Sequence, residues 1–464
     1  MCHRLQSCRR GTAAWAAVVC FTMVAPDAIA SDASSDRLVV HEWGTFTSLQ
    51  DENGQAIGGI NVDDEPLPDF VHRIANFLML RPGVAVPIFA KGTPRCHPHV
   101  TMRLETPVVY FHPAPEEKLP IEVDVEVAFR SGWLSEYYPD AAVEAPGVKG
   151  HTSFGPITGD TLGRLTWRNL QVGTEGLGPE TSSPVWLAPR AVDAANVSTV
   201  DGESERYLFY RGVGRVESPM RVSRDTSDQS LVLTAHFPAA VTAQPGKFAV
   251  PTLWLVEIRD DGTSAFREIP GFEIAGDGKP QAIATIPGQF ADAEFDEDNL
   301  QELTAAMRST LVEDGLFGDE ADALLGTWKH SYFQTPGLRL FYLLPQAWTD
   351  QVLPLTISPA AEVVRTMVGR VEIVTPQQRQ LLSRIAAGPA STPELRQTAP
   401  LSCFVQPAKE PENFAAYREL GRFRNALVLD ELARRPTPGL KSFIDGYGLW
   451  GYTPRTPATA PAAQ

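Results

Sequence analysis

Strand-like runs separated by turn residues recur through the first two-thirds of the chain, and this pattern most limits the possible folds. Between residues 121 and 127, apolar residues alternate with acidic ones at every second position. This period of two is typical of a half-buried β-strand. Glu122, Asp124 and Glu126 share its outer face; three carboxylates can hold a cation, but we expect a solvated face that discourages edge pairing. The run 108–111 is the expected partner strand.

A β-hairpin is predicted further along the chain. Residues 253–258 and 265–269 are both strand-like, and the Asp-Gly turn at 260–262 separates them. Other short strand-like runs, such as 206–210, lie between turn signals. We therefore predict a mostly β, antiparallel, sandwich-like domain over residues 31–290.

The pattern changes near residue 295, where apolar residues recur at helical spacing. Asn299 and Glu302 are expected to form a capping pair at the start of a first helix. A second helix is predicted over residues 319–333, and together the two make an αα-hairpin. Trp328 lies on the apolar stripe of the second helix, so we expect it in the core rather than on a ligand surface.

Further strands and helices are predicted towards the C-terminus. Helices are expected at about 376–387 and between 412 and 435. Residues 291–452 therefore form a predicted α+β region, and the Thr-, Pro- and Ala-rich tail at 453–464 is expected to be disordered. The fold class as a whole is α+β, with β-structure predominating.

The first 30 residues have the pattern of a cleavable signal peptide. Three arginines precede an apolar run at 13–25, and small residues at 28–30 suit a signal peptidase. We predict cleavage before Ser31 and an exported protein, periplasmic or extracellular. The apolar run is short for a bilayer-spanning helix, and no later segment predicts one.

The chain is acidic, with a formal net charge of −16, and loss of the arginine-rich leader would make it more negative. Such a charge repels the phosphate backbone, so we expect no nucleic-acid partner. The sequence is compatible with a small-molecule, a carbohydrate or a protein partner. Only Cys96 and Cys403 follow the leader, and in an oxidising compartment two cysteines are expected to pair as a disulfide.

No complete catalytic motif is present: the sequence has no H-E-x-x-H, no C-x-x-C and no P-loop. The candidate site is a concentration of histidine near residue 97. His97 and His99 flank Pro98, and in an extended chain they point to the same side. Two imidazoles placed in this way can share a zinc or copper ion, although both can equally lie in solvent.

A second candidate pair stands in the strand-like run near the start. By strand parity Glu42, and not His41, faces the side on which Val40 packs. A carboxylate on an apolar face is costly unless it is paired. Either an arginine such as Arg211 or a metal ion would satisfy Glu42. Some arginines, Arg190 and Arg206 among them, stand beside apolar residues. We expect these to form structural ion pairs within the protein rather than to bind a substrate.

Several phrases of this sequence together resemble a group of exported bacterial proteins described only as hypothetical. The resemblance covers residues of about 38–375 and implies a shared fold and a cell-envelope or secreted setting, with no assigned activity. Its phrases are HEWGTFT (41–47), ETPVVYF (105–111), LFYRGVG (208–214), the residues Thr327-Trp328 and Ser331-Tyr332-Phe333, and VGRVE (368–372).

Two functions follow from these observations. The first is a binding or structural role in the cell envelope or outside the cell. The alternative is a metal-dependent hydrolase, with His41, His97 and His99 as ligands of zinc or copper and Glu42 as the candidate catalytic group. Whether the protein is an enzyme stays open at this level.

Overall fold

The computed structural model describes residues 37–62, 67–75, 89–150, 153–237, 247–275, 277–389, 413–447, 449 and 451–454. The strands are β1 (Val39–Gln50), β2 (His72–Arg73), β3 (Phe89–Ala90), β4 (Thr93–Pro94), β5 (Met102–His112), β6 (Ile121–Arg130), β7 (Gly132–Tyr138), β8 (Ala142–Glu144), β9 (Val148–Lys149), β10 (Ser153–Phe154), β11 (Leu162–Val172), β12 (Val197–Ser198), β13 (Ser204–Glu205), β14 (Leu208–Gly214), β15 (Met220–Arg224), β16 (Leu231–Ala235), β17 (Lys247–Ile258), β18 (Ser264–Ala275), β19 (Gln281–Ile286), β20 (Gly337–Leu344), β21 (Leu355–Ser358) and β22 (Glu362–Ile373). The helices are α1 (Pro184–Arg190), the 3-10 helix η2 (Asp292–Glu294), α2 (Asn299–Glu313), α3 (Gly318–Thr327), α4 (Lys329–Phe333), α5 (Gln346–Val352), α6 (Pro376–Ala386), α8 (Phe414–Glu419), α9 (Arg424–Arg434) and α10 (Pro438–Tyr447).

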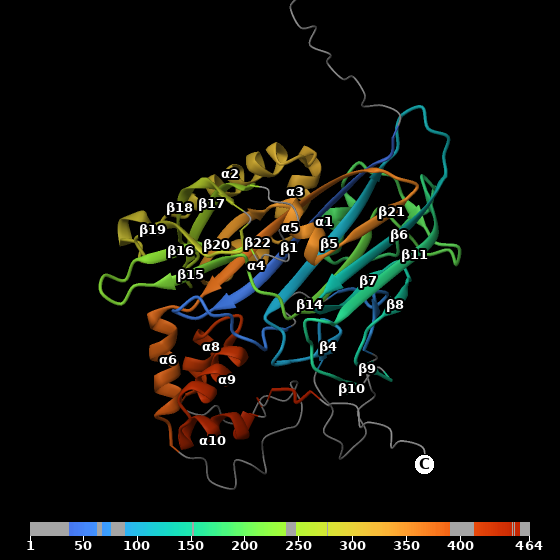
Figure 1. Cartoon of the computed structure of the whole chain (residues 1–464). Helices are drawn as coiled ribbons and strands as arrows, with labels where there is room; N and C mark the ends of the chain where they lie inside the picture. The colour runs from blue at the N-terminus through green and yellow to red at the C-terminus, as the bar shows by residue number, and fades with distance from the viewer. Residues whose placement is uncertain are drawn as a thin grey trace, which may run out of the picture.

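One large mixed sheet organises the molecule (Figure 1). Its strands follow the order β13-β12-β11-β7-β14-β5-β1-β22-β20-β17-β18. β1 lies at its centre, antiparallel to β5 and parallel to β22 over its whole length. The mostly β, α+β class is therefore confirmed. The purely antiparallel sandwich is not confirmed, because the central β1–β22 pair is parallel.

Strands from both predicted regions share this sheet. β20 and β22 come from the region after residue 290, yet β20 pairs with β17 and β22 pairs with β1. The predicted boundary at residue 290 therefore does not separate two sheets. The central position of β1 follows from its residues, since the strand is buried on both faces from Val40 to Gln50.

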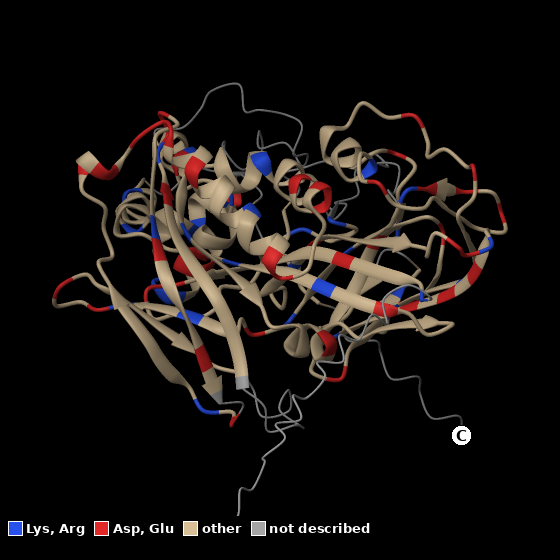
Figure 2. Cartoon of the chain, turned by 90° about the horizontal axis from the view of Figure 1, so that it is seen from above, with Lys and Arg blue, Asp and Glu red and all other residues tan. Residues whose placement is uncertain are grey.

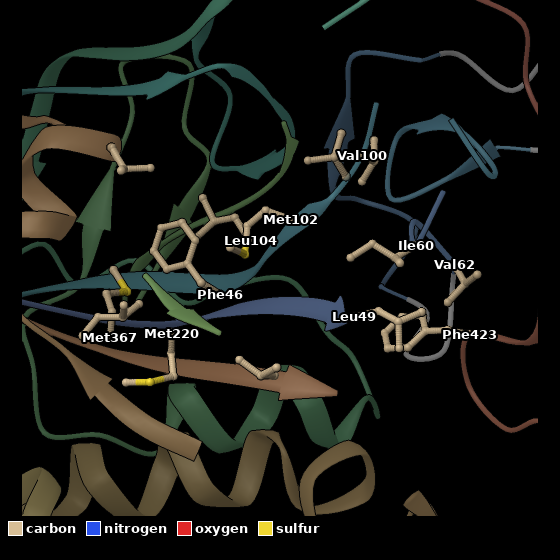
Figure 3. Packing of buried hydrophobic residues seen from close by; sticks show 14 of the residues in the cluster. Phe46, Leu49, Ile60, Val62, Val100, Met102, Leu104, Met220, Met367 and Phe423 are labelled. Carbon is tan, nitrogen blue, oxygen red and sulfur yellow. The ribbon is translucent and has the colours of Figure 1, made fainter. Parts of the chain in front are cut away.

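Opposite faces of β1 contribute to two different hydrophobic cores. Phe46 joins the first, which we call the strand-side core and which also contains residues of β6, β11 and β16. Figure 3 shows Phe46 in this core, with labelled residues of β5, β15 and β22 around it. Trp43 joins the second, the helix-side core, with Leu303 of α2 and Trp328. Neighbouring residues of β1 thus face different surroundings.

Several local predictions are confirmed and one pairing is wrong. The hairpin is β17 with β18, and Trp328 is fully buried between α3 and α4. The strand β6 alternates as expected, and its Glu126 and Asp124 pair with arginines of β11. Its partners are β11 and β21 rather than β5, because β5 is already flanked by β1 and β14.

The C-terminal helices form a separate group at one end of the sheet, where α6, α8, α9 and α10 pack against one another (Figure 1). The single helix predicted between residues 412 and 435 is two helices, α8 and α9. Gly421 between them has a φ of 80°, which favours glycine and interrupts a helix. Asn299 is the first residue of α2 rather than its cap, which is Asp298. Among the described residues, no helix is both long and apolar enough to cross a membrane.

Candidate metal centre

Two histidines and a glutamate meet in the helix-side layer of the molecule. His41 is the third residue of β1, His112 is the last residue of β5, and Glu320 is the third residue of α3. The His41 and Glu320 side chains are 3% and 0% exposed, and that of His112 is 14% exposed. The donor atoms of the three side chains all lie within 4.8 Å of one another.

The carboxylate of Glu320 joins the two imidazoles. Its Oε2 lies 2.7 Å from Nδ1 of His41, and its Oε1 lies 2.9 Å from Nε2 of His112. The backbone N–H of Phe317 donates to the same Oε2 at 2.8 Å. The carboxylate is therefore satisfied on both oxygens, as a buried carboxylate must be.

Each donor is positioned by the element that carries it. His41 shares with Trp43 the face of β1 that meets the helices. Its neighbour on β5 is Tyr110, two residues before His112 on the same face. Glu320 is the third residue of α3 and accepts a hydrogen bond from the backbone N–H of the N-cap residue Phe317; the positive end of the helix dipole there favours a carboxylate.

The environment keeps the carboxylate of Glu320 ionised. Burial by itself would raise its pKa, but the hydrogen bonds from His112 and His41 outweigh burial and hold the pKa below its ordinary value. A negative, buried carboxylate between two imidazoles is a ligand set suited to a divalent transition-metal ion. Among the described residues, no other group of three His, Cys, Asp or Glu side chains has its donor atoms this close.

Glu42 belongs to a different network on the opposite face of β1. Its Oε2 accepts a hydrogen bond from Nε of Arg365 at 2.5 Å, and its Oε1 accepts one from the hydroxyl of Tyr210. Arg365 also pairs with Asp350 of α5 at 2.8 Å. Strand parity thus placed Glu42 correctly. Its partner is Arg365 and not Arg211, because Arg365 is the residue beside it on the parallel strand β22.

The structure does not bring His97 and His99 to His41. Both precede β5, whereas His41 lies beside its far end, and an 11-residue strand spans roughly 30 Å. His97 donates from Nε2 to the carbonyl of Gly155, and its Nδ1 accepts from the N–H of His99. Nδ1 of His99 accepts from the N–H of Ile157. The lone pairs that a metal ion would need are already used.

The arginines considered from the sequence take part in contacts within the protein. Arg190 pairs with Glu205 through two nitrogens, Arg206 donates to a backbone carbonyl, and Arg211 lies 3.7 Å from Glu136. Cys96 is buried, but Cys403 lies outside the described residues, so the disulfide stays a prediction. The signal peptide and the far C-terminal tail also lie outside them.

Sequence reasoning found His41 but missed its two partners. His112 directly follows the predicted strand 108–111, and Glu320 stands at the start of the predicted second helix. Both elements were predicted, but nothing local indicated that a strand end and a helix start would meet. The signal available was only chemical: a histidine and a glutamate at element ends that face the same layer.

No protein-family model matches the chain, and no curated protein matches it in sequence. Similar solved structures include the mu-homology domain of yeast delta-COP-I complexed with the Dsl1 WxWxV peptide, at 8% identity and a TM-score of 0.23, covering 73% of this chain and 97% of that chain. The Fcho1 mu homology domain of Danio rerio with a bound Eps15 peptide has 6% identity and a TM-score of 0.24, with coverages of 73% and 94%. TM-scores this low carry no argument about fold or ligand.

Proposed function

We propose that this chain is an exported protein that binds a divalent transition-metal ion through His41, His112 and Glu320. One observation carries the proposal: three donors from elements far apart in sequence converge in a buried site, with their donor atoms within 4.8 Å of one another. Two imidazoles and a carboxylate form a donor set that zinc and copper accept readily.

The spacing of the donors suits such an ion. Two ligands that each lie about 2.0 Å from a tetrahedral zinc ion are separated by about 3.3 Å. The two histidine–glutamate distances are 2.7 and 2.9 Å, each to a different oxygen of the carboxylate, and the donor atoms all lie within 4.8 Å of one another. Binding an ion therefore requires the histidine and glutamate donors to move apart by a few tenths of an ångström and the two histidines to lie within reach of the same ion. The coordinating nitrogens must be free of protons, and a shift of each proton to the other nitrogen of its ring provides this.

The burial of the site favours holding an ion over hydrolysis. A hydrolytic centre needs an open coordination position that substrate and water can reach. His41 and Glu320 are almost fully buried, and Glu42, the earlier catalytic candidate, points to the other face of the sheet and is held by Arg365. Ion binding is therefore the function that the geometry supports best.

The test is the metal content of untagged protein lacking residues 1–30. After equilibration with zinc or copper and removal of excess ion, elemental analysis should find one ion per chain. Glu320→Gln and His112→Ala should each lose it. His330→Ala is the matched control, because His330 is exposed on the adjacent helix α4. Protein without stoichiometric metal, or His112→Ala with undiminished metal, would overturn the proposal.

The exported setting is part of the proposal and is supported by the N-terminal pattern of arginines, apolar run and small residues. It also fits the acidic composition; Figure 2 shows Asp and Glu spread over many outer loops. N-terminal sequencing of protein recovered from the cell envelope or the medium should begin at or within a residue or two of Ser31. Protein that retains Met1 in that fraction would contradict export by cleavage.

A further inference from the structure

We infer that the side chain of Phe317 is the cover that determines what reaches the His41–His112–Glu320 centre, an inference that rests on the proposed metal binding. Phe317 is the N-cap residue of α3, immediately before Gly318. Its role is to let a small ion pass when the ring swings away, and to keep larger ligands from the donor atoms when the ring is in place.

Phe317 contacts all three donor residues. Its ring centroid lies 4.5 Å from that of His41 and 4.9 Å from that of His112, with the ring edge-on to His112. Its backbone N–H donates to Oε2 of Glu320. A single residue therefore holds the carboxylate through its main chain and covers both imidazoles through its side chain.

The exposure of these residues shows which side of the centre the ring closes. Phe317 is 48% exposed, whereas the His41 and Glu320 side chains beneath it are 3% and 0% exposed. Of the three donors, His112 alone is partly exposed, and it lies against the same ring. Removing the ring would thus uncover imidazole atoms without disturbing a buried core.

The chain around Phe317 suits a side chain that moves on a fixed backbone. Leu316 is buried and anchors the preceding position. Gly315 has a φ of 118°, which a residue with a side chain adopts only with strain. The hydrogen bond from the Phe317 N–H to Glu320 keeps the backbone in place. The ring itself, half in solvent, can rotate about its own bonds while the cap remains formed.

A side chain that covers the site changes the rates at which a metal ion binds and dissociates more than it changes the affinity for the ion. If the open position of the ring is populated to about 1–10%, ions enter and leave about 10- to 100-fold more slowly than they would without the ring. Both rates change by the same factor, so the dissociation constant, which is their ratio, stays the same. The closed ring also explains how a three-donor site can hold an ion without presenting it to substrates.

The first experiment needs no metal. Metal-free wild type and Phe317→Ala are treated with diethylpyrocarbonate, and the modification of each histidine is followed by peptide mass spectrometry. We expect His112 and His41 to react several-fold faster in the variant. The exposed His330 is the internal control and should react equally in both proteins. Equal rates at His112 and His41 would overturn the inference.

The second experiment measures zinc release to a chromophoric chelator by stopped flow. Phe317→Ala should release and take up zinc at least tenfold faster, and Phe317→Leu should lie between it and wild type. Val312→Ala, at a partly exposed position on α2, should behave as wild type. Unchanged rates in Phe317→Ala would reject the cover.

These experiments distinguish failure of the proposed metal binding from failure of the inference about Phe317. If wild type binds no metal, the proposed function fails, and the diethylpyrocarbonate rates still decide whether Phe317 shields the imidazoles. If wild type binds metal and Phe317→Ala shows unchanged rates in both assays, the metal site stands and the cover does not. Circular dichroism of Phe317→Ala checks the fold, and Phe317→Leu, which keeps an apolar side chain, provides a second variant.

Discussion

Nδ1 of His41 lies 2.7 Å from Oε2 of Glu320, although the two residues are 279 positions apart in the chain. This contact ties the central strand β1 to the start of helix α3. The next residue of β1, Glu42, makes an equally buried ion pair with Arg365 on the opposite face of the sheet. Two neighbouring residues thus anchor two layers of the molecule.

Removing the Glu320 carboxylate should destabilise the protein even without metal. Glu320→Ala leaves the buried imidazole of His41, the partly exposed imidazole of His112 and the Phe317 N–H without their acceptor, at a cost of about 3–5 kcal/mol in the free energy of unfolding. Urea unfolding of metal-free protein measures this. The control is Asp322→Ala on the same helix, whose exposed pair with Arg308 should contribute less than about 1 kcal/mol. Equal effects of the two variants would contradict the prediction.

The pair on the other face of β1 should show strong coupling. Arg365→Met leaves the buried carboxylate of Glu42 without its cation and should cost about 3–5 kcal/mol. The double variant Glu42→Gln with Arg365→Met should cost less than the sum of the two single changes. A double-mutant cycle in urea tests both statements, and strict additivity would show that the pair does not interact.

Trp328 should be a major contributor to the helix-side core. It is fully buried and stacks on Tyr332 with a centroid distance of 5.8 Å. Trp328→Ala should therefore lower the free energy of unfolding by about 3–5 kcal/mol. Leu177→Ala, at a position that is 86% exposed, should change it by less than about 0.5 kcal/mol. A near-wild-type melting temperature for Trp328→Ala would refute the core assignment.

His97 should make stability depend on pH in mildly acidic solution. Burial, which its hydrogen bond to Gly155 only partly offsets, lowers the pKa of His97 from 6.5 to about 4. Nδ1 of His97 accepts a hydrogen bond from the backbone N–H of His99. Protonation of Nδ1 would therefore bring two N–H groups against each other. Between these two pKa values the unfolded chain binds more protons than the folded chain, so stability falls as the pH drops from 6.5 to 4.

The expected loss over that interval is of the order of 3 kcal/mol. His97→Gln removes the titrating group, so its unfolding free energy should lack this part of the pH dependence. Denaturant unfolding of both proteins at several pH values between 7 and 4 provides the comparison. If the two curves run parallel, His97 is not responsible for acid sensitivity.

The local structure of this protein could be predicted well from its sequence. The period-two pattern of β6 and the Asp-Gly turn between β17 and β18 depend on nearby residues, and both were confirmed. Parity along β1 also placed Glu42 on the side of Val40. Such properties follow from backbone geometry over a few residues, so no knowledge of distant contacts is required.

Strand partners and the candidate site could not be predicted in the same way. The sequence offered β5 as the partner of β6 and offered His97 as a partner of His41. The structure instead pairs β6 with β11 and β21, and places Glu320 and His112 beside His41. Proximity in sequence favoured the predicted partners, whereas both edges of β5 are already paired with β1 and β14, so β6 pairs elsewhere.

The sequence by itself determined several of the strands and helices, β6 and the β17–β18 hairpin among them, and the face of β1 that Glu42 occupies. Only the tertiary structure decided that the end of β5 and the start of α3 meet at His41, and that β22 brings Arg365 to Glu42. The physical reason is that buried charged and polar groups need partners. Those partners are supplied by whichever elements the packing of the two cores brings together, and no local pattern encodes that choice.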